Sequence, residues 1–329
     1  MVQTRWVRSK LEAAAPHVVV DVLEGVSATG DNVLNVALKD LAAKTPGLFT
    51  KELEDGLLAG AYDLVVHSLK DMPTTLPEGL VLAAITERED PRDALVVNAK
   101  WRGRGLGELP AGCVVGTSSV RREAVLRREF PGLVVRLIRG NVNTRLAKVE
   151  SGEFDAAILA CAGLTRLGLQ YRVERVLDDA EFMYAVGQGA LGVQCRAADA
   201  DLVRLLGALT HADTAARCRA ERALLRHLQG GCQVPLAVAS RVVVEAGHSR
   251  RRLVELRCRL SSPEGAVVVE DAMSGDADDP EALGVALAQR LLHVGGAKHL
   301  IEGWSEVAAR SSSRLARPIT YGSAESPSR

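Results

Sequence analysis

The chain has 329 residues, which is long for one ordinary domain and indicates two or three. Lysine plus arginine equal aspartate plus glutamate, 41 against 41, and this neutral total argues against a general nucleic-acid or membrane-surface binder. No uncharged run approaches the ~18 apolar residues of a membrane helix, and residues 1–10 lack the apolar centre of a signal peptide. We therefore expect a cytoplasmic protein. The six cysteines show no CxxC spacing, so neither disulfides nor a metal site is expected.

Apolar runs of strand length alternate with helical stretches through the first half of the chain. This alternation predicts an α/β protein with mostly parallel sheets, in which ligands bind beyond the carboxyl ends of the strands. The expected strands are Val18–Val22, Leu64–His67, Leu80–Ala84, Ala94–Val97, Val114–Gly116, Val134–Ile138 and Ala156–Ala160. The expected helices are Lys51–Ala59, Val120–Phe130, Thr144–Ser151 and Ala200–Leu228.

Two segments are predicted to cross between two lobes, the charged Glu87–Arg92 and the glycine-rich Tyr184–Gly192. Two crossings mean that one lobe is made of two separate chain segments. A smaller α+β domain follows, with strands Arg241–Glu245, Leu253–Leu260 and Ala266–Val269 and then the helix Pro280–Leu292. We predict lobe 1 from residues 1–90 and 188–208, lobe 2 from 91–187, a C-terminal domain from 209–310 and a disordered tail at 311–329.

The first chemical cluster stands where the apolar strand at Leu64–His67 runs into polar residues and Pro73. Its polar members, Ser68, Lys70 and Asp71, are expected at the carboxyl end of that strand, where active-site loops occur. From spacing alone, a solvated strand-to-turn cap is the favoured reading.

The second cluster is basic and consists of two similar units, Gly116–Arg122 and Arg139–Arg145. Each unit reads as strand, small polar turn and helix start, and free N–H groups at a helix start favour an anion. Well-made arginine contacts add roughly 1.5–3 kcal/mol each. This predicts a ligand with several carboxylates or phosphates. Nucleotides are not favoured because the P-loop spacing is absent. The alternative is a solvated helix face.

The third cluster is Gly230–Pro235, in which Cys232 follows two glycines and precedes Val-Pro. Such a cysteine belongs to a loop. An accessible thiol there could act as a nucleophile, with an ordinary pKa near ~8.5. A buried cysteine in a tight turn is the other reading, and the spacing does not choose between them.

Together and in this order, the clusters resemble the porphobilinogen deaminase family, over roughly residues 3–305. The strings that carry the resemblance are Ser27–Asp31, Gly47–Glu54, His67–Pro73, Arg88–Arg92, Gly116–Arg122, Arg139–Arg145, Gly187–Ala190 and Gly230–Pro235. The resemblance implies three domains, namely two lobes like type II periplasmic binding proteins and a small α+β C-terminal domain. It implies the joining of four porphobilinogen units into linear hydroxymethylbilane, with release of ammonia.

The resemblance also implies roles for single residues. The cofactor would be dipyrromethane, held by a thioether to Cys232, and Asp71 would be the catalytic carboxylate. The remaining cofactor-binding positions would be Lys70, Ser118, Ser119, Arg121, Arg122, Arg139 and Arg145. The substrate-binding positions would be Ser68, Phe49, Arg166 and Gln188. The family is usually monomeric and needs no metal.

The N-terminus departs from the family pattern. The family begins with a strand and a Gly-Thr-Arg-x-Ser-x-Leu-Ala string, whereas this sequence starts inside the helix that follows, at Met1–Thr4. We therefore expect the first strand to be missing, either because the sequence of a normal enzyme starts late or because the chain is a truncated inactive copy. Two rival functions are a non-catalytic two-lobe solute-binding protein and a phosphate-ester enzyme. The first does not account for the Gly-Gly-Cys loop, and the sequence shows no metal constellation for the second.

Overall fold

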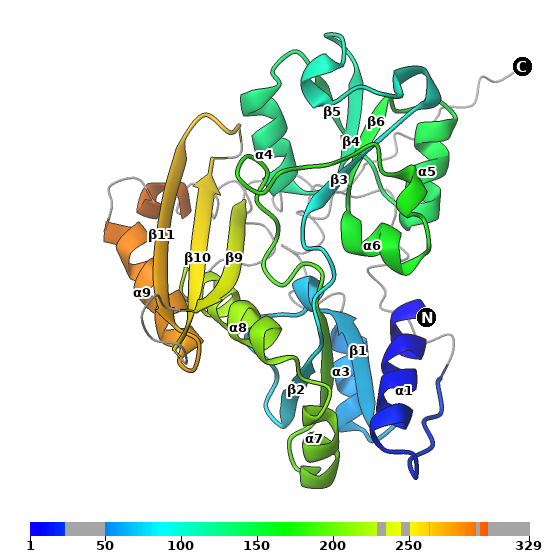
Figure 1. Cartoon of the computed structure of the whole chain (residues 1–329), viewed down its shortest axis with the longest axis vertical. Coiled ribbons are helices and arrows are strands. Elements are labelled where there is room, and N and C mark those ends of the chain that lie inside the picture. The colour runs from blue at the N-terminus through cyan, green and yellow to red at the C-terminus, as the bar shows by residue number, and fades with distance from the viewer. Residues whose placement is uncertain (24–49, 229–234, 245–250, 263, 294–296, 302–329) are drawn as a thin grey trace, which may run out of the picture.

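The computed structural model describes residues 1–23, 50–228, 235–244, 251–262, 264–293 and 297–301. In these residues the chain forms two lobes and a third domain, each built around its own sheet (Figure 1). In Figure 1 the first lobe lies at the bottom, the second at the top and the third domain at the left. The predicted architecture of two lobes plus a small α+β domain is confirmed.

The first lobe contains a sheet in the order β1-β8-β2, with the late strand β8 antiparallel to both neighbours. Helix α1 has an apolar face on which Val7 and Leu11, one turn apart, are buried against Val193 of β8 and Leu206 of α7. The elements of this lobe are α1 (Val2–Ala14), α3 (Lys51–Leu58), β1 (Leu64–Ser68), the 3₁₀ turn η2 (Leu69–Asp71), β2 (Leu80–Ile85), β8 (Leu191–Arg196) and α7 (Ala200–Gly207).

The second lobe contains a five-stranded sheet in the order β5-β4-β6-β3-β7. Strand β6, and β3 after its first residue Asp93, are apolar because separate clusters of side chains cover the two faces of the sheet. The elements are β3 (Asp93–Val97), η3 (Ala99–Trp101), η4 (Leu106–Glu108), β4 (Val114–Thr117), α4 (Val120–Glu129), β5 (Val134–Leu137), α5 (Val142–Glu150), β6 (Ala156–Ala160), α6 (Cys161–Arg166), η5 (Gln170–Arg172) and β7 (Arg175–Val176).

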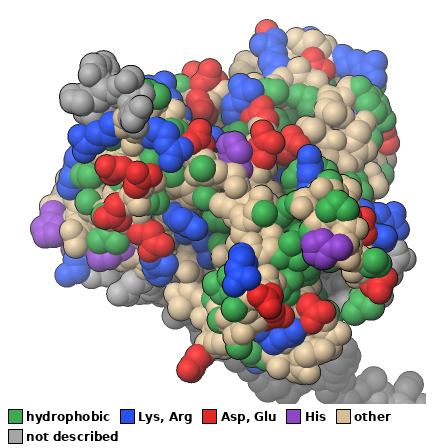
Figure 2. Space-filling view, turned by 60° about the horizontal axis from the view of Figure 1, so that its bottom comes forward, with side chains coloured by type: hydrophobic (Ala, Val, Ile, Leu, Met, Phe, Trp, Pro, Cys, Tyr) green, Lys and Arg blue, Asp and Glu red, His purple; other side chains and the backbone are tan. Residues whose placement is uncertain are grey.

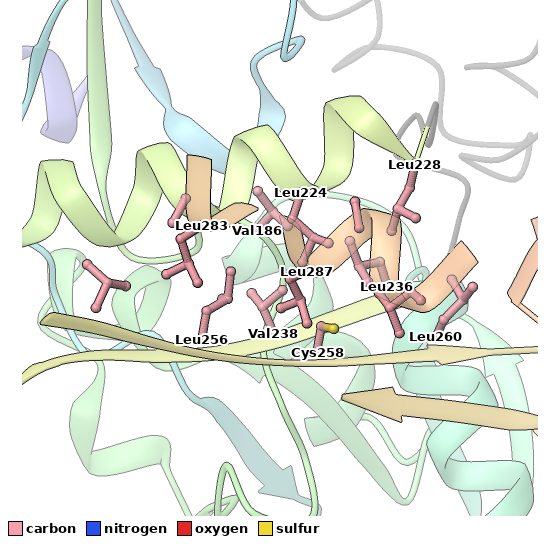
Figure 3. Close-up of a cluster of buried hydrophobic side chains, with 14 of the residues drawn as sticks. Val186, Leu224, Leu228, Leu236, Val238, Leu256, Cys258, Leu260, Leu283 and Leu287 are labelled. Carbon is pink, nitrogen blue, oxygen red and sulfur yellow. The ribbon is translucent and has the colours of Figure 1, made fainter. Parts of the chain in front are cut away.

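The third domain is an antiparallel sheet, β11-β10-β9, with helices α8 and α9 packed on one face (Figure 1). Leu224 of α8 and Leu287 of α9 meet Leu256 and Cys258 of β10 in its core (Figure 3). The helices approach so closely that a Cβ on Gly284 would lie 2.2 Å from Ala220 O. The elements are α8 (Ala212–His227), β9 (Leu236–Val244), β10 (Arg252–Ser261), β11 (Val268–Asp276) and α9 (Pro280–His293).

Most of the predicted elements are confirmed to within a few residues, but three expectations need correction. Val18–Val22 is not a strand; Val19 is 81% exposed, and no described strand offers it a ladder partner. Parallel pairing holds for β4 with β5 and β6, whereas the pairs of β3 and β8 are antiparallel. The predicted helix Ala200–Leu228 is two helices, because the chain turns at Ala208 and restarts with His211 as the N-cap of α8.

Candidate functional site

The Leu69–Pro73 turn carries Lys70 and Asp71 at the end of β1. Burial alternates along β1. After the strand, the apolar side chains of Leu69 and Met72, which are 1% and 3% exposed, anchor the turn. The backbone of Leu69 donates to Ala190 O at 3.0 Å, and the backbone of Met72 donates to Leu69 O at 3.2 Å. These anchors leave Lys70 half-buried and Asp71 exposed.

Ser119 is the N-cap of α4, and its hydroxyl accepts from the backbone N–H of Arg122 at 3.5 Å. Ser118, just before it, is half-buried. The next side chains, Arg121 and Arg122, are buried and converge on Asp93 at the first position of β3, with N–O distances of 2.8 and 2.7 Å. Burial alone would raise the pKa of Asp93, but the two guanidinium groups hold it well below its usual range.

Both arginines also donate hydrogen bonds to backbone oxygens, one within the second lobe and one in the segment that leaves it. Arg122 donates to Ile158 O at 2.9 Å, and Arg121 donates to Met183 O at 2.5 Å. The Nε of Arg121 is buried and finds no acceptor among the described residues. Sequence reasoning missed Asp93, although a carboxylate that opens a fully buried strand is a recognisable signal of a charge partner.

The start of α5 mirrors that of α4. Asn141 is its N-cap and accepts from the backbone N–H of Thr144 at 2.9 Å. Arg145 Nε donates to Gly140 O at 2.7 Å, which fixes the guanidinium over the turn after Arg139. Both predicted units therefore are strand, polar turn and capped helix start, as expected.

Electrostatic coupling places these groups from the two lobes in one cluster. Burial lowers the pKa of Lys70; Asp71 raises it, and Arg122 and Arg145 lower it further. Burial also lowers the pKa of Arg145 to about 10, with Arg122 and Arg139 adding to the effect and Asp71 opposing it. Cations therefore face one another with too few carboxylates to balance them. Such a site suits a ligand that carries several negative charges.

The remaining predicted residues have contacts of their own. The hydroxyl of Ser68 accepts from Gln3 Nε2 at 2.9 Å, a contact from α1 that sequence reasoning missed. Gln188 is buried, and its amide donates to Pro91 O at 2.6 Å and to Asp93 Oδ1 at 2.8 Å. Arg166 donates to Gly189 O at 2.6 Å. Phe49 and Cys232 lie outside the described residues.

A second buried network joins the third domain to both crossings between the lobes. Glu221 of α8 accepts from Arg88 in the first crossing and from the backbone N–H of Gly187 in the second, at 2.6 and 2.8 Å. Ser240 Oγ donates to the same carboxylate at 2.6 Å. Arg88 in turn donates to Gln188 O at 2.7 Å. The two crossings are thus tied together by a helix of the third domain.

Other ligand classes find less support in the part of the chain that the structure describes. There, no three side chains of His, Cys, Asp or Glu gather as a metal site would require. None of the described helices has the length and hydropathy needed to span a membrane. On the face drawn in Figure 2, basic and acidic side chains lie interspersed, in keeping with the neutral total charge.

Among solved structures, similarity is found to the substrate-binding protein of an amino acid ABC transporter, with 14% identity and a TM-score of 0.34. That match covers 63% of this chain and 79% of the other. An ancestral amino acid-binding protein shows 18% identity and a TM-score of 0.33, covering 62% and 77% of the two chains. Scores this low carry no argument about function.

Sequence comparison is more specific. Residues 1–204 match the family model described as "Porphobilinogen deaminase, dipyromethane cofactor binding domain", and residues 215–293 match its C-terminal domain. Porphobilinogen deaminase of Nostoc sp. is 49% identical, over 92% of this chain and 90% of that protein. The Synechococcus elongatus enzyme is 48% identical over 92% and 91% of the two chains, and that of Parasynechococcus marenigrum is 48% identical over 93% and 94%. The chain therefore belongs to the porphobilinogen deaminase family.

Proposed function

We propose that this chain joins four porphobilinogen molecules head to tail into linear hydroxymethylbilane, with release of ammonia, in tetrapyrrole biosynthesis. The observation that carries the proposal is the cation cluster around Asp71, assembled from two lobes of a chain of this family. Each porphobilinogen ring bears an acetate and a propionate. The ligand chemistry thus matches the excess of positive charge.

The same cluster fits a dipyrromethane cofactor, whose two linked rings carry a carboxylate pair each. Its carboxylates would meet Lys70, Arg139 and Arg145 and the N–H groups at the starts of α4 and α5, near Ser118 and Ser119. Arg122 contributes positive charge to this field, and Arg121 contributes the Nε–H that finds no acceptor among the described residues. We assign the covalent anchor to Cys232. When bound, the cofactor supplies the free pyrrole carbon to which the first substrate is joined.

Asp71 is the residue to which we assign catalysis. It stands exposed on the turn, between half-buried Lys70 and buried Met72, so it can approach the N–H of a substrate ring. Positive charge develops on that ring as ammonia leaves. A carboxylate at about 4 Å, with an effective dielectric constant of about 20, stabilises that charge by about 4 kcal/mol. When it is protonated, the same group can pass its proton to the departing amine, and it is then the carboxylate that stabilises the charge on the ring.

We assign Ser68, Phe49, Arg166 and Gln188 to the substrate side of the site. Support comes from Ser68, adjacent to the turn, and from Arg166, whose guanidinium reaches the second crossing at Gly189. Gln188 would act through its place at the crossing, since its amide already bonds Pro91 and Asp93.

The membership of the sheets supports domain boundaries close to 1–90 with 188–208, 91–187 and 209–310. We further propose a cytoplasmic monomer that needs no metal. An inactive copy and a non-catalytic solute-binding protein are not favoured, because the family match spans both the cofactor-binding and the C-terminal domain.

The decisive experiment is the intact mass of the purified chain, made in cells that produce porphobilinogen. We expect an added mass of two linked pyrroles, absent in Cys232→Ser and present in the control Cys113→Ser. Asp71→Ala should keep the added mass and lose turnover, while Asp90→Ala, at an exposed ion pair with Arg92, should keep both. Added mass on Cys232→Ser would refute the anchor, and normal turnover in Asp71→Ala would refute the catalytic carboxylate.

A further inference from the structure

Helix α8 of the third domain contacts the backbone of the Leu69–Pro73 turn, about 150 residues earlier in the chain. Arg222 Nη2 donates to Pro73 O at 2.7 Å, and Arg222 Nη1 donates to Met72 O at 3.3 Å. Arg222 is 7% exposed, so the contact is made inside the protein and not on its surface. These carbonyl groups directly follow Asp71.

The apolar face of α8 supports the same turn. Ala215 and Cys218 are buried in one cluster with Leu69 and Met72. Ala215, Cys218 and Arg222 follow the i, i+3, i+7 spacing of one helix face. The two apolar side chains therefore pack under the turn, and the guanidinium holds its far end.

The opposite side of the turn is fixed by the second crossing. Gly187 has a φ of +71°, and a Cβ there would lie 3.2 Å from the carbonyl carbon of Leu69 and 3.3 Å from Lys70 N. A Cβ on Gly192 would lie 2.7 Å from Met72 Sδ. The turn is thus enclosed between the crossing and α8. Because the turn is packed closely on both sides, a small shift of the second crossing or of α8 would move Asp71.

We propose that Arg222 is a positioning residue for Asp71, through which the third domain fixes the position of the Asp71 carboxylate. The proposal rests on the catalytic role proposed for Asp71. Arg222 touches no reacting atom in this scheme and acts through the carbonyl groups of Met72 and Pro73. The helix that carries it, α8, ends at His227, five residues before Cys232 in the sequence.

The test compares full-length holoenzyme carrying Arg222→Met, Arg222→Lys or the control Arg219→Met, which changes an exposed arginine of the same helix. Arg222→Met keeps the apolar stem and removes both donors. We expect kcat to fall about 10- to 100-fold, because small misplacement of a reacting group has effects of that size. KM for porphobilinogen should stay within about 3-fold, since no substrate contact is removed. The dipyrromethane mass should remain.

Hydrogen exchange gives a readout that does not depend on activity. In Arg222→Met, the amides of Leu69 and Met72, which bond Ala190 O and Leu69 O, should exchange faster while the rest of the chain keeps its protection. Arg222→Lys should be intermediate in kcat and in exchange, because one ammonium replaces a two-pronged donor. Arg219→Met should match the unaltered chain in both.

The outcomes separate this proposal from the proposed function. Unchanged kcat together with unchanged exchange in Arg222→Met would overturn it, as would a loss of protection throughout the chain that parallels the loss of turnover. If Arg222→Met does not fold, Arg222→Lys decides, and full wild-type values in both readouts overturn the proposal. If the unaltered chain fails to consume porphobilinogen, the proposed function fails, and a local change in exchange would still support the positioning contact.

Discussion

The carboxylate of Glu221 and the guanidinium of Arg88 form two hydrogen bonds, of 2.6 and 3.0 Å, at a place where neither side chain is more than 2% exposed. Burial by itself would raise the pKa of Glu221, but Arg88 and the N–H of Gly187 lower it. A pair this buried stays charged only because each partner is present. Loss of either partner would therefore leave an uncompensated buried charge between the third domain and the first crossing.

Glu221→Gln should cost about 3–5 kcal/mol of unfolding free energy, because it leaves the buried Arg88 without its counter-charge. The matched control is Glu281→Gln, which breaks an exposed ion pair between Glu281 of α9 and Arg226 of α8 and should cost less than about 1 kcal/mol. Urea denaturation of both variants measures the difference. Equal losses would show that the burial of the Arg88 pair contributes nothing.

Gly189→Ala should be more destabilising than Gly60→Ala. Both glycines have positive φ values, +89° and +74°, and a side chain in this region costs about 1–2 kcal/mol. At Gly60 the new Cβ meets open space, whereas at Gly189 it would lie 2.5 Å from Glu89 O. Thermal denaturation of the two variants separates backbone strain from the clash between the crossings. Matching melting temperatures would contradict the close approach.

His67 should make the fold sensitive to mild acid. It is buried, and burial lowers its pKa from 6.5 to about 4, partly opposed by its hydrogen bond to Gln194. Gln194 Nε2 donates to Glu54, so its Oε1 accepts from His67 Nε2–H, which the neutral and the protonated imidazole both carry. Because burial outweighs this hydrogen bond, the folded state disfavours the second proton. The stabilisation is complete above pH 6.5 and is lost as the pH falls toward 4.

We therefore expect the unfolding free energy to drop, between pH 6.5 and 4, by on the order of 3 kcal/mol more in the unaltered chain than in His67→Gln. His17→Gln, at an exposed position, serves as the control and should follow the unaltered chain. Denaturant titrations at several pH values provide the measurement. Parallel curves for His67→Gln and the unaltered chain would exclude His67 as the titrating group.

The positive charge of Arg145 acts on the carboxylates of the incoming ring as well as on those of the cofactor, so Arg145→Met should raise KM for porphobilinogen by about 10-fold or more, since a charged hydrogen bond contributes roughly 1.5–3 kcal/mol. The effect on kcat should be smaller, because the carboxylate contact exists before and during reaction. Arg136→Met removes an exposed arginine of β5 that packs over Phe154, outside the cluster, and should leave KM unchanged. Steady-state kinetics at low ionic strength tests both. A fall in kcat at constant KM would contradict the assignment of Arg145 to carboxylate binding.

Local patterns predicted much of the fold and the two turns at which the candidate site is placed. Continuous apolar runs located β3 and β6, and polar residues at the ends of β1 and β4 located the Leu69–Pro73 turn and the start of α4. These features depend on neighbours in the sequence. Val18–Val22 shows the limit, because an apolar run becomes a strand only where another strand pairs with it.

Contacts between distant parts of the chain could not be predicted. An arginine at a helix start looks the same whether it faces a ligand or a buried carboxylate, so the role of Asp93 in holding Arg121 and Arg122 stayed hidden. The bond from Arg222 to Pro73 joins residues 149 positions apart. Only the folded arrangement shows that α8 reaches the turn.

The lowered pKa values of Lys70 and Arg145 also bear on the shape of the molecule. Lys70 belongs to the first lobe and Arg145 to the second, so their mutual repulsion opposes a closer approach of the two lobes. A polycarboxylate between them acts as a shared counter-ion and draws the lobes together. A covalently attached cofactor would be a permanent counter-ion. Salt could then screen the repulsion between the lobes, but it could not displace the carboxylates that draw them together.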